Sequence, residues 1–163
     1  MNSRENSHNQ VEYELRVLNQ LIVSTLDNVD EYRRAVAMVE GQLNTLRRRV
    51  LDRTHAVERL QRQVRTLGGQ PATSRSTLAA AFASLLSMRH RFLKDDENLV
   101  QDAERGDHYL KRQFQSYLGD NLLSATARES ISDAYDYCAA LEPPAETWSP
   151  PTKHHLAGTP LSA

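Results

Sequence analysis

The sequence predicts an all-α fold, an antiparallel four-helix bundle with a helical crossover between its second and third helices. Apolar residues recur at intervals of three and four along most of the chain, which is the period of an amphipathic helix. Glycine and proline number only six each in 163 residues, and aromatic residues are few. A composition of this kind, rich in leucine, alanine, arginine and glutamate, is typical of all-helical proteins.

The first two helices are predicted from two consecutive narrow apolar seams. One seam runs from Leu15 to Val39 and the other from Leu43 to Leu67. The same register continues through Gly41, so the periodicity is compatible with one long coiled-coil helix or with two helices joined by a turn near Gly41. The second seam ends at LGGQP, residues 67–71, in which glycine can cap the helix and proline prevents its continuation.

The second half of the chain predicts the crossover and two more bundle helices. Serines precede residues 78–93, whose broad apolar face indicates the crossover helix. The aspartates of KDDEN, residues 94–98, suit the first turn of a third bundle helix that continues to residue 118. A fourth helix is expected to begin near Ser124, with an apolar seam over residues 127–141.

Composition also divides the chain into three parts. Residues 1–10 are polar, and we expect a disordered N-terminus there. Residues 11–142 form the predicted four-helix bundle domain. Residues 143–163 hold most of the prolines and show no periodicity, which predicts a disordered tail.

Charge and composition limit the classes of partner and compartment. The formal net charge is only -1, so no overall field attracts nucleic acid or a membrane surface. No apolar run approaches the roughly 20 residues that span a bilayer, and the N-terminus lacks the apolar stretch of a signal peptide. The single cysteine, Cys138, excludes an internal disulfide and fits a reducing compartment. We therefore expect a cytoplasmic protein of bacterial type that binds neither nucleic acid nor membrane.

The second helix carries seven arginines, a number that would suit a nucleic-acid-binding helix. No aromatic residues alternate with them, as they do in helices that stack on bases. The third helix is rich in acids. We expect the basic helix to pack beside this acidic one.

Two stretches of sequence suggest a family. The first stretch, LQRQVRTLGGQPATSRSTLAAAF, contains a leucine–double-glycine segment followed by a serine-rich helix start. The second, AERGDHYLKRQFQSYL, contains a Glu-Arg-Gly-Asp motif, and a charged break at residues 94–97 lies between the two stretches. Their order resembles the bacterial PA2169-type four-helix-bundle family, a domain of unknown function (DUF2383) in the ferritin-like superfamily. The resemblance covers about residues 15–142 and implies a turn between the first two helices, which favours the break near Gly41.

The resemblance raises the question of a metal site, because ferritin-like bundles often bind two metal ions between inward carboxylates and Glu-x-x-His pairs. Asp107 lies on the apolar seam of the third helix, but Val29, Arg59 and Tyr135 occupy the positions where related sequences have acids or a histidine. We therefore expect no metal ligands and no cofactor. The weak candidate is Asp107, with Glu104 and Tyr135 nearby, and a di-iron or manganese centre is the less favoured alternative.

An inward aspartate needs partners, because burying an unpaired carboxylate is costly. We expect Asp107 to be hydrogen-bonded by Tyr32, Tyr135 or Arg53 in the core. The preceding Gly106 is expected to allow two helices to approach closely.

The remaining chemical signals are weaker. Asp52 and His55 have the spacing of a metal-binding pair, but the seam positions put His55 off the core face, which favours a solvated helix face. Cys138 lies on an apolar seam, where a free cysteine usually packs in the core. The KHH sequence at residues 153–155 lies in the tail and suits only adventitious metal binding. No catalytic residue is predicted.

These observations predict a non-catalytic ferritin-like bundle with a degenerate metal site, which acts through protein contacts or homo-oligomerisation. We expect an assembly because the broad apolar face over residues 78–93 exceeds what a monomer would bury. The alternative is a metal-binding ferritin-like protein in stress response or metal handling.

Overall fold

The computed structural model describes residues 2–38, 43–73 and 96–140, and in these ranges the chain forms four helices. Their bounds are α1 (Asn2–Met38), α2 (Leu43–Thr66), α4 (Asp96–Leu118) and α5 (Ala125–Ala139). The predicted all-α fold is confirmed. None of the four described helices combines the length and the apolar composition that a membrane-spanning segment requires.

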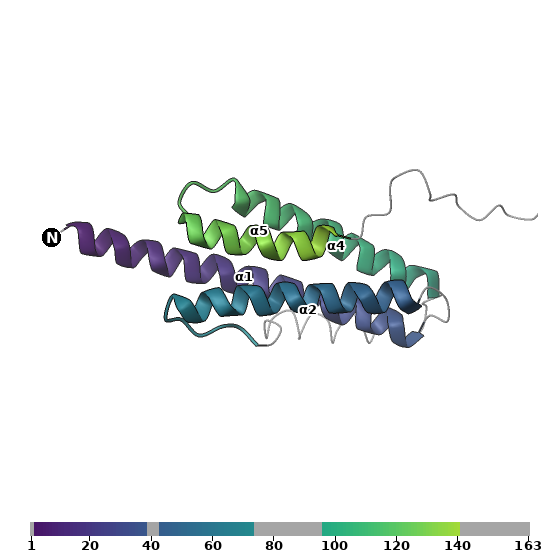
Figure 1. Ribbon diagram of the computed structural model, residues 1–163. Coiled ribbons are helices and arrows are strands. Elements are labelled where there is room, and N and C mark those ends of the chain that lie inside the picture. Colours follow the sequence, from purple (N-terminus) through teal and green to yellow (C-terminus); the bar gives the residue numbers. More distant parts are fainter. Residues whose placement is uncertain (1, 39–42, 74–95, 141–163) are drawn as a thin grey trace, which may run out of the picture.

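The four helices form a bundle in which α1 and α5 each pack against both α2 and α4 (Figure 1). Neighbouring helices run antiparallel. Asn19 of α1 hydrogen-bonds to the carbonyl of Gln70 just beyond α2, at 3.2 Å, whereas Asn28 contacts Arg53 further back along α2. The diagonal helices α2 and α4 consequently run parallel, so α2 ends at one end of the bundle and α4 begins at the other. The crossover predicted over residues 78–93 lies outside the described residues.

The first two helices are separate, as the family resemblance implied. α1 ends at Met38, α2 begins at Leu43, and the two helices lie side by side, which excludes one continuous coiled coil. Gly41 itself lies outside the described residues. At the other end of α2, the backbone N–H groups of Gly68 and Gly69 donate to the carbonyls of Arg65 and Val64, both at 3.0 Å. Gly68 has a φ of 77°, so this is the Schellman cap expected from LGGQP.

The connection between α4 and α5 is fixed by side chains of α1. Ser124 caps α5, as predicted, by accepting a hydrogen bond from the backbone N–H of Ala127. The buried Glu14 in turn accepts a bond from the backbone N–H of Ser124 at 2.7 Å. Tyr13 donates to Asp120 in the turn before α5, and this bond lowers the pKa of the Asp120 carboxyl. The turn between α4 and α5 is thereby held to the first helix.

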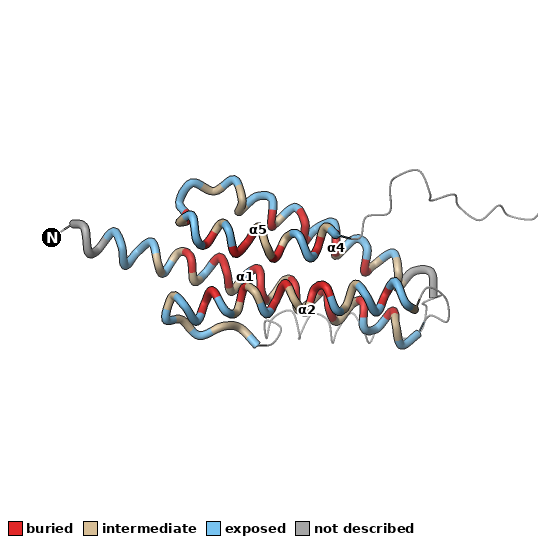
Figure 2. Tube along the Cα trace, in the orientation of Figure 1, coloured by how far each residue is buried: buried red, intermediate tan, exposed pale blue. Residues whose placement is uncertain are grey.

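Buried residues line the inner faces of all four helices (Figure 2). The larger apolar cluster includes Leu21, Leu60, Phe114 and Ile131, one from each helix. The smaller cluster lies nearer the end at which α1 finishes. Its buried members are Tyr32, Ala35, Leu46 and Ala103. A polar layer divides the core between the two clusters. It is formed by one buried residue from each of α1, α2 and α4, namely Asn28, Arg53 and Asp107.

The N-terminus differs from the sequence-based expectation. Residues 1–10 were expected to be disordered, but α1 begins at Asn2. The segment is polar, yet it contains no glycine or proline to interrupt a helix that is stabilised further along by packing. His8 pairs with Glu12 one turn later at 3.2 Å, and Gln10 donates to the carbonyl of Leu122 at 3.4 Å. The boundary at residue 142 and the tail lie outside the described residues.

We predict that Gly68→Ala lowers the free energy of unfolding by about 1–2 kcal/mol, because a Cβ disfavours the left-handed conformation. Chemical denaturation measures the loss. Gly119→Ala is the matched control, since its Cβ would meet only backbone oxygens at 3.6 and 3.8 Å and its φ is not positive. Equal losses in the two variants would contradict the assignment of the cap.

Candidate functional site

The predicted inward acid, Asp107, lies on the face of α4 that points into the bundle, and it is 5% exposed. Gly106 precedes it at the contact with α1. A Cβ at Gly106 would overlap the carboxylate of Glu31 and lie 3.1 Å from Nδ2 of Asn28. Asn28 also donates to the carbonyl of Ala103 at 3.2 Å. The glycine therefore leaves room for the side chains of Asn28 and Glu31 of α1 against α4.

Arg53 of α2 is the principal partner of Asp107. Its side chain is fully buried, and Nη2 forms an ion pair with Oδ1 of the aspartate. Nη2 also donates to the carbonyl of Cys138 on α5 at 3.3 Å, and Nε donates to Oδ1 of Asn28 on α1 at 3.2 Å. The guanidinium lies 5.3 Å from the ring centre of Tyr32, close enough for a cation–π contact. One arginine thus contacts all four helices.

Two more cations surround the same carboxylate. Nη1 of Arg49 lies 3.4 Å from Oδ2 of Asp107, and Nζ of Lys111 lies 3.3 Å from the same oxygen. Arg49 also donates to the hydroxyl of Tyr32 at 3.2 Å. We call these residues together the ion cluster; its members are Asn28, Tyr32, Arg49, Arg53, Asp107 and Lys111. Its arrangement holds helices together through charge and leaves the carboxylate occupied by cations.

The cluster and its burial alter the acidity of its members. Burial alone would lower the pKa of the Arg53 guanidinium, but the attraction of Asp107 outweighs it and the pKa is raised. Burial, assisted by the negative charge of Asp107, raises the pKa of Tyr32 to about 12. Burial likewise raises the pKa of the Cys138 thiol to about 12. Tyr32 and Cys138 therefore stay neutral at physiological pH, and Cys138 lacks the thiolate that a nucleophile needs.

The other predicted site residues do not join Asp107. Glu104 is exposed on α4. Tyr135 accepts a hydrogen bond from Gln115 at 3.0 Å, and its ring lies tilted against that of Phe114, with ring centres 6.0 Å apart. Tyr135 was named as a partner of Asp107, but its hydroxyl is turned toward Gln115 instead. Among the residues that the structure describes, no group of three or more histidine, cysteine, aspartate or glutamate side chains could hold a metal ion.

Sequence reasoning named Tyr32 and Arg53 but missed Asn28, Arg49 and Lys111. The last two could have been found from helical spacing. Arg49 lies one turn before Arg53 and Lys111 one turn after Asp107, so each shares the inward face of its neighbour. Asn28 gives no such signal, because its role depends on how closely α1 approaches α4.

The spacing of Asp52 and His55 was also misleading. A solvated helix face was predicted here, but Asp52 is buried and pairs with Arg48 at 3.1 Å. His55 instead lies 3.4 Å from Glu58 and contacts Tyr137 of α5, with ring centres 5.6 Å apart. Asp52 is buried because α5 covers that side of α2.

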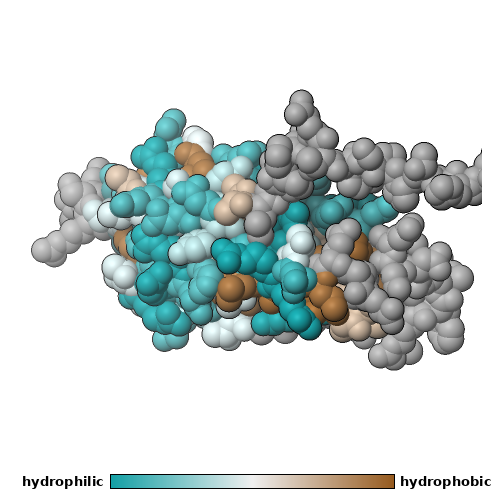
Figure 3. Space-filling view, turned by 45° about the vertical axis from the view of Figure 1, so that its right-hand side comes forward, coloured by the Kyte–Doolittle hydropathy of each residue, from teal (hydrophilic) through white to brown (hydrophobic). Residues whose placement is uncertain are grey.

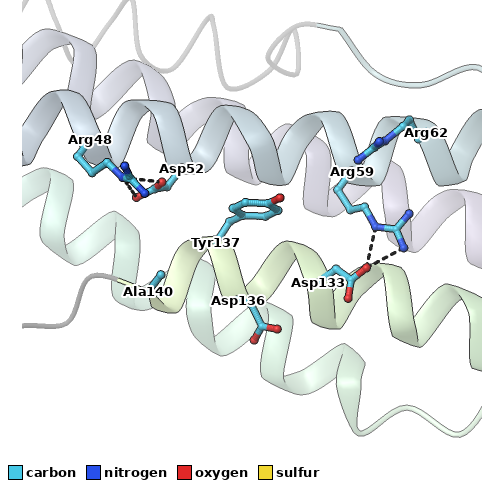
Figure 4. Close-up of a pocket in the computed structure, with 8 residues that line it drawn as sticks. All are labelled: Arg48, Asp52, Arg59, Arg62, Asp133, Asp136, Tyr137 and Ala140. Carbon is cyan, nitrogen blue, oxygen red and sulfur yellow. Dashed lines mark hydrogen bonds and ion pairs between the residues drawn. The ribbon is translucent and has the colours of Figure 1, made fainter.

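A groove follows the junction of α2 and α5 on the outside of the bundle (Figure 4). The pair Arg48–Asp52 lies at one end, and Arg59 pairs with Asp133 across the two helices at 2.7 Å. Tyr137 lies between these pairs. The groove presents guanidinium and carboxylate groups and one aromatic ring, a surface suited to a charged partner.

A family model described as a domain of unknown function (DUF2383) matches residues 14–120, more than half of the chain. The chain belongs to the DUF2383 family. The match spans most of α1, α2 and α4 and ends before α5. It includes every side chain of the ion cluster in this DUF2383 protein. No curated protein and no solved structure matches the chain.

We predict that Asp107→Asn lowers the free energy of unfolding by about 3–5 kcal/mol, because it leaves the buried Arg53 without its counter-charge. Arg53→Met is also expected to destabilise. The double variant should lose less than the sum of the two single losses by about 1–3 kcal/mol, since the residues interact directly. Urea denaturation of the four proteins measures this coupling, and strict additivity would contradict a direct ion pair. Asp133→Asn, in a half-buried pair at the surface, should cost less than about 1 kcal/mol.

The pKa of Tyr32 predicts a loss of stability in alkali. The pKa of about 12 in the folded protein lies above the ordinary tyrosine value of 10.0. The stabilisation by the neutral Tyr32 hydroxyl is therefore complete below about pH 10 and is lost as the pH rises toward 12. Tyr32→Phe should therefore reduce the stability difference between about pH 8 and pH 11. Tyr109→Phe, at a tyrosine that is 56% exposed, is the control. An unchanged difference in Tyr32→Phe would show that burial does not protect the Tyr32 proton.

Proposed function

We propose that this DUF2383 protein is a non-enzymatic, ferritin-like four-helix bundle that acts through protein contacts, with a degenerate metal site in its interior. The parallel course of α2 and α4 is compatible with ferritin-like topology, which requires a long connection between its second and third helices. The observation that carries the proposal is the guanidinium of Arg53 beside Asp107, inside the bundle.

The residues around Asp107 do not fit a di-iron or manganese centre. Such a centre needs several carboxylates or imidazoles that converge on the ions. Here one carboxylate meets Arg53, Arg49 and Lys111. A divalent ion about 4 Å from one of these cations would be repelled by about 8 kcal/mol at an effective dielectric constant of about 20. The cations supply the positive charge that a metal would otherwise bring to the carboxylate.

The alternative is a metal-binding ferritin-like protein in stress response or metal handling. It is favoured only by family resemblance and by the inward Asp107. In that case the aspartate would have to exchange its cations for a metal, and other acids would have to approach it.

Metal content decides between the two proposals. We would purify the untagged protein from cells supplied with iron, manganese and zinc, and measure bound metal by mass spectrometry. We predict less than about 0.1 metal ion per chain, unchanged in Asp107→Asn, because the ion cluster competes with metal for the carboxylate. The exposed Asp136→Asn is the matched control.

A variant with alanine at His154 and His155 separates adventitious binding by the tail from binding inside the bundle. Near-stoichiometric metal that survives this change, but disappears in Asp107→Asn while the variant remains folded by circular dichroism, would overturn the proposal. It would establish the metal-binding alternative.

A further inference from the structure

The outer face formed by α2 and α5 has its charges separated between the two helices. Along this face α2 carries Arg48, Arg59 and Arg62, together with Asp52, which is buried and paired with Arg48. On α5 the face carries Asp133 and Asp136, with the exposed Glu129 one helical turn before Asp133. One helix is therefore basic and its neighbour acidic. On the α2 side Glu58 is also exposed, but it lies beside His55.

The same face carries an exposed apolar side chain. Tyr137 of α5 is 41% exposed, one of the few large hydrophobic side chains left exposed in the described ranges, and it lines the groove. Figure 4 shows Tyr137 at the junction of the two helices, within the groove. The described surface elsewhere in Figure 3 is mostly hydrophilic with small separate hydrophobic patches. An apolar centre with a charged rim is the usual composition of a protein interface.

We propose that a second copy of this chain docks on the α2–α5 face, with α2 of each copy over α5 of the other. This inference rests on the proposed function, in that it names the partner of a protein that acts through contacts. The arrangement is a two-fold dimer whose axis runs parallel to the helices. The basic helix of each copy then meets the acidic helix of the other.

Charge selects this axis over its rival. A two-fold axis in the interface but perpendicular to the helices would put α2 on α2, and arginine on arginine. Rotation about the axis parallel to the helices also leaves each residue at the same height along the bundle in both copies. Within one copy Gln63 and Ser130 are level, because the serine hydroxyl donates to the glutamine at 3.2 Å. The preceding residues, Arg62 and Glu129, are therefore brought together between copies.

The charges at this level are available for such a contact. Among the described residues, neither Arg62 nor Glu129 makes an ion pair within one copy, whereas Arg59 and Asp133 already pair with each other.

The size of the α2–α5 face limits the affinity of the dimer. Two helices about 10 Å wide and about 22–36 Å long present about 400–700 Å². Stable complexes bury about 800 Å² per partner, so the dimer is expected to have a micromolar Kd.

Charge reversal tests the pairing, with mass measured by light scattering after size exclusion between about 2 and 200 µM chain. We expect the native protein to dimerise in this range and both Arg62→Glu and Glu129→Arg to weaken the dimer at least about tenfold, since each places like charges across the axis twice. An equimolar mixture of the two variants should dimerise again, because the mixed dimer restores opposite charges at both contacts. Recovery in the mixture would exclude misfolding as the cause of the loss.

Tyr137→Lys tests the apolar centre, and Tyr109→Lys on the exposed face of α4 is its control. We expect Tyr137→Lys to give monomers and Tyr109→Lys to dimerise like the native chain. A native protein that stays monomeric at about 200 µM, a dimer that withstands both charge reversals, or a dimer broken only by Tyr109→Lys would overturn the inference. Metal content of the same fractions tests the proposed function separately, so either can fail without the other.

Discussion

The ion pair between Arg53 and Asp107 is the interaction on which the interior of this bundle depends. The guanidinium meets a carboxylate from α4, a side-chain amide from α1 and a backbone carbonyl from α5. Apolar seams tolerate a shift of one helix along another, because one aliphatic side chain replaces the next. A shift by one turn, about 5.4 Å, would separate these charges and leave them buried without partners. The pair therefore specifies the register of all four helices at once.

This specificity has an energetic cost that the surrounding residues reduce. A buried ion pair often stabilises a protein no more than apolar residues of the same volume, because both charges lose their hydration. Here the arginine also bonds to Asn28 and lies over the ring of Tyr32, and the aspartate meets Arg49 and Lys111 as well. The apolar clusters on either side exclude water and strengthen these attractions. The layer is thus maintained by several contacts at once.

The sequence predicted the helices and their caps better than the site. Periodicity identified four bundle helices, and the local chemistry of Gly68 and Ser124 correctly marked two helix ends. The break between the first two helices required the family resemblance, because the seam itself continues through Gly41. At the site, Asp107 and Arg53 were found from their seam positions. Tyr135 was assigned wrongly because a seam position fixes which face a residue shares but not the direction of its side-chain hydroxyl.

Helix ends without strong stop signals were predicted least well. Polarity suggested disorder before residue 11, although nothing in that segment interrupts a helix. The burial of Asp52, where a solvated helix face was predicted, was missed for a different reason. It depends on the packing of α5 against α2 and on the pair with Arg48, neither of which the sequence of α2 alone indicates. Such contacts between distant segments are what a single sequence does not reveal.

The seven arginines of α2 show how one helix can serve two purposes. Arg49 and Arg53, one turn apart, face inward and neutralise Asp107. Arg59 lies six residues after Arg53, about 240° around the helix, and consequently faces outward. The number of arginines alone therefore overstates the charge offered to a partner. What remains outside is a short basic row beside the acids of α5, which suits a protein surface of matching charge better than the uniform charge of a nucleic acid.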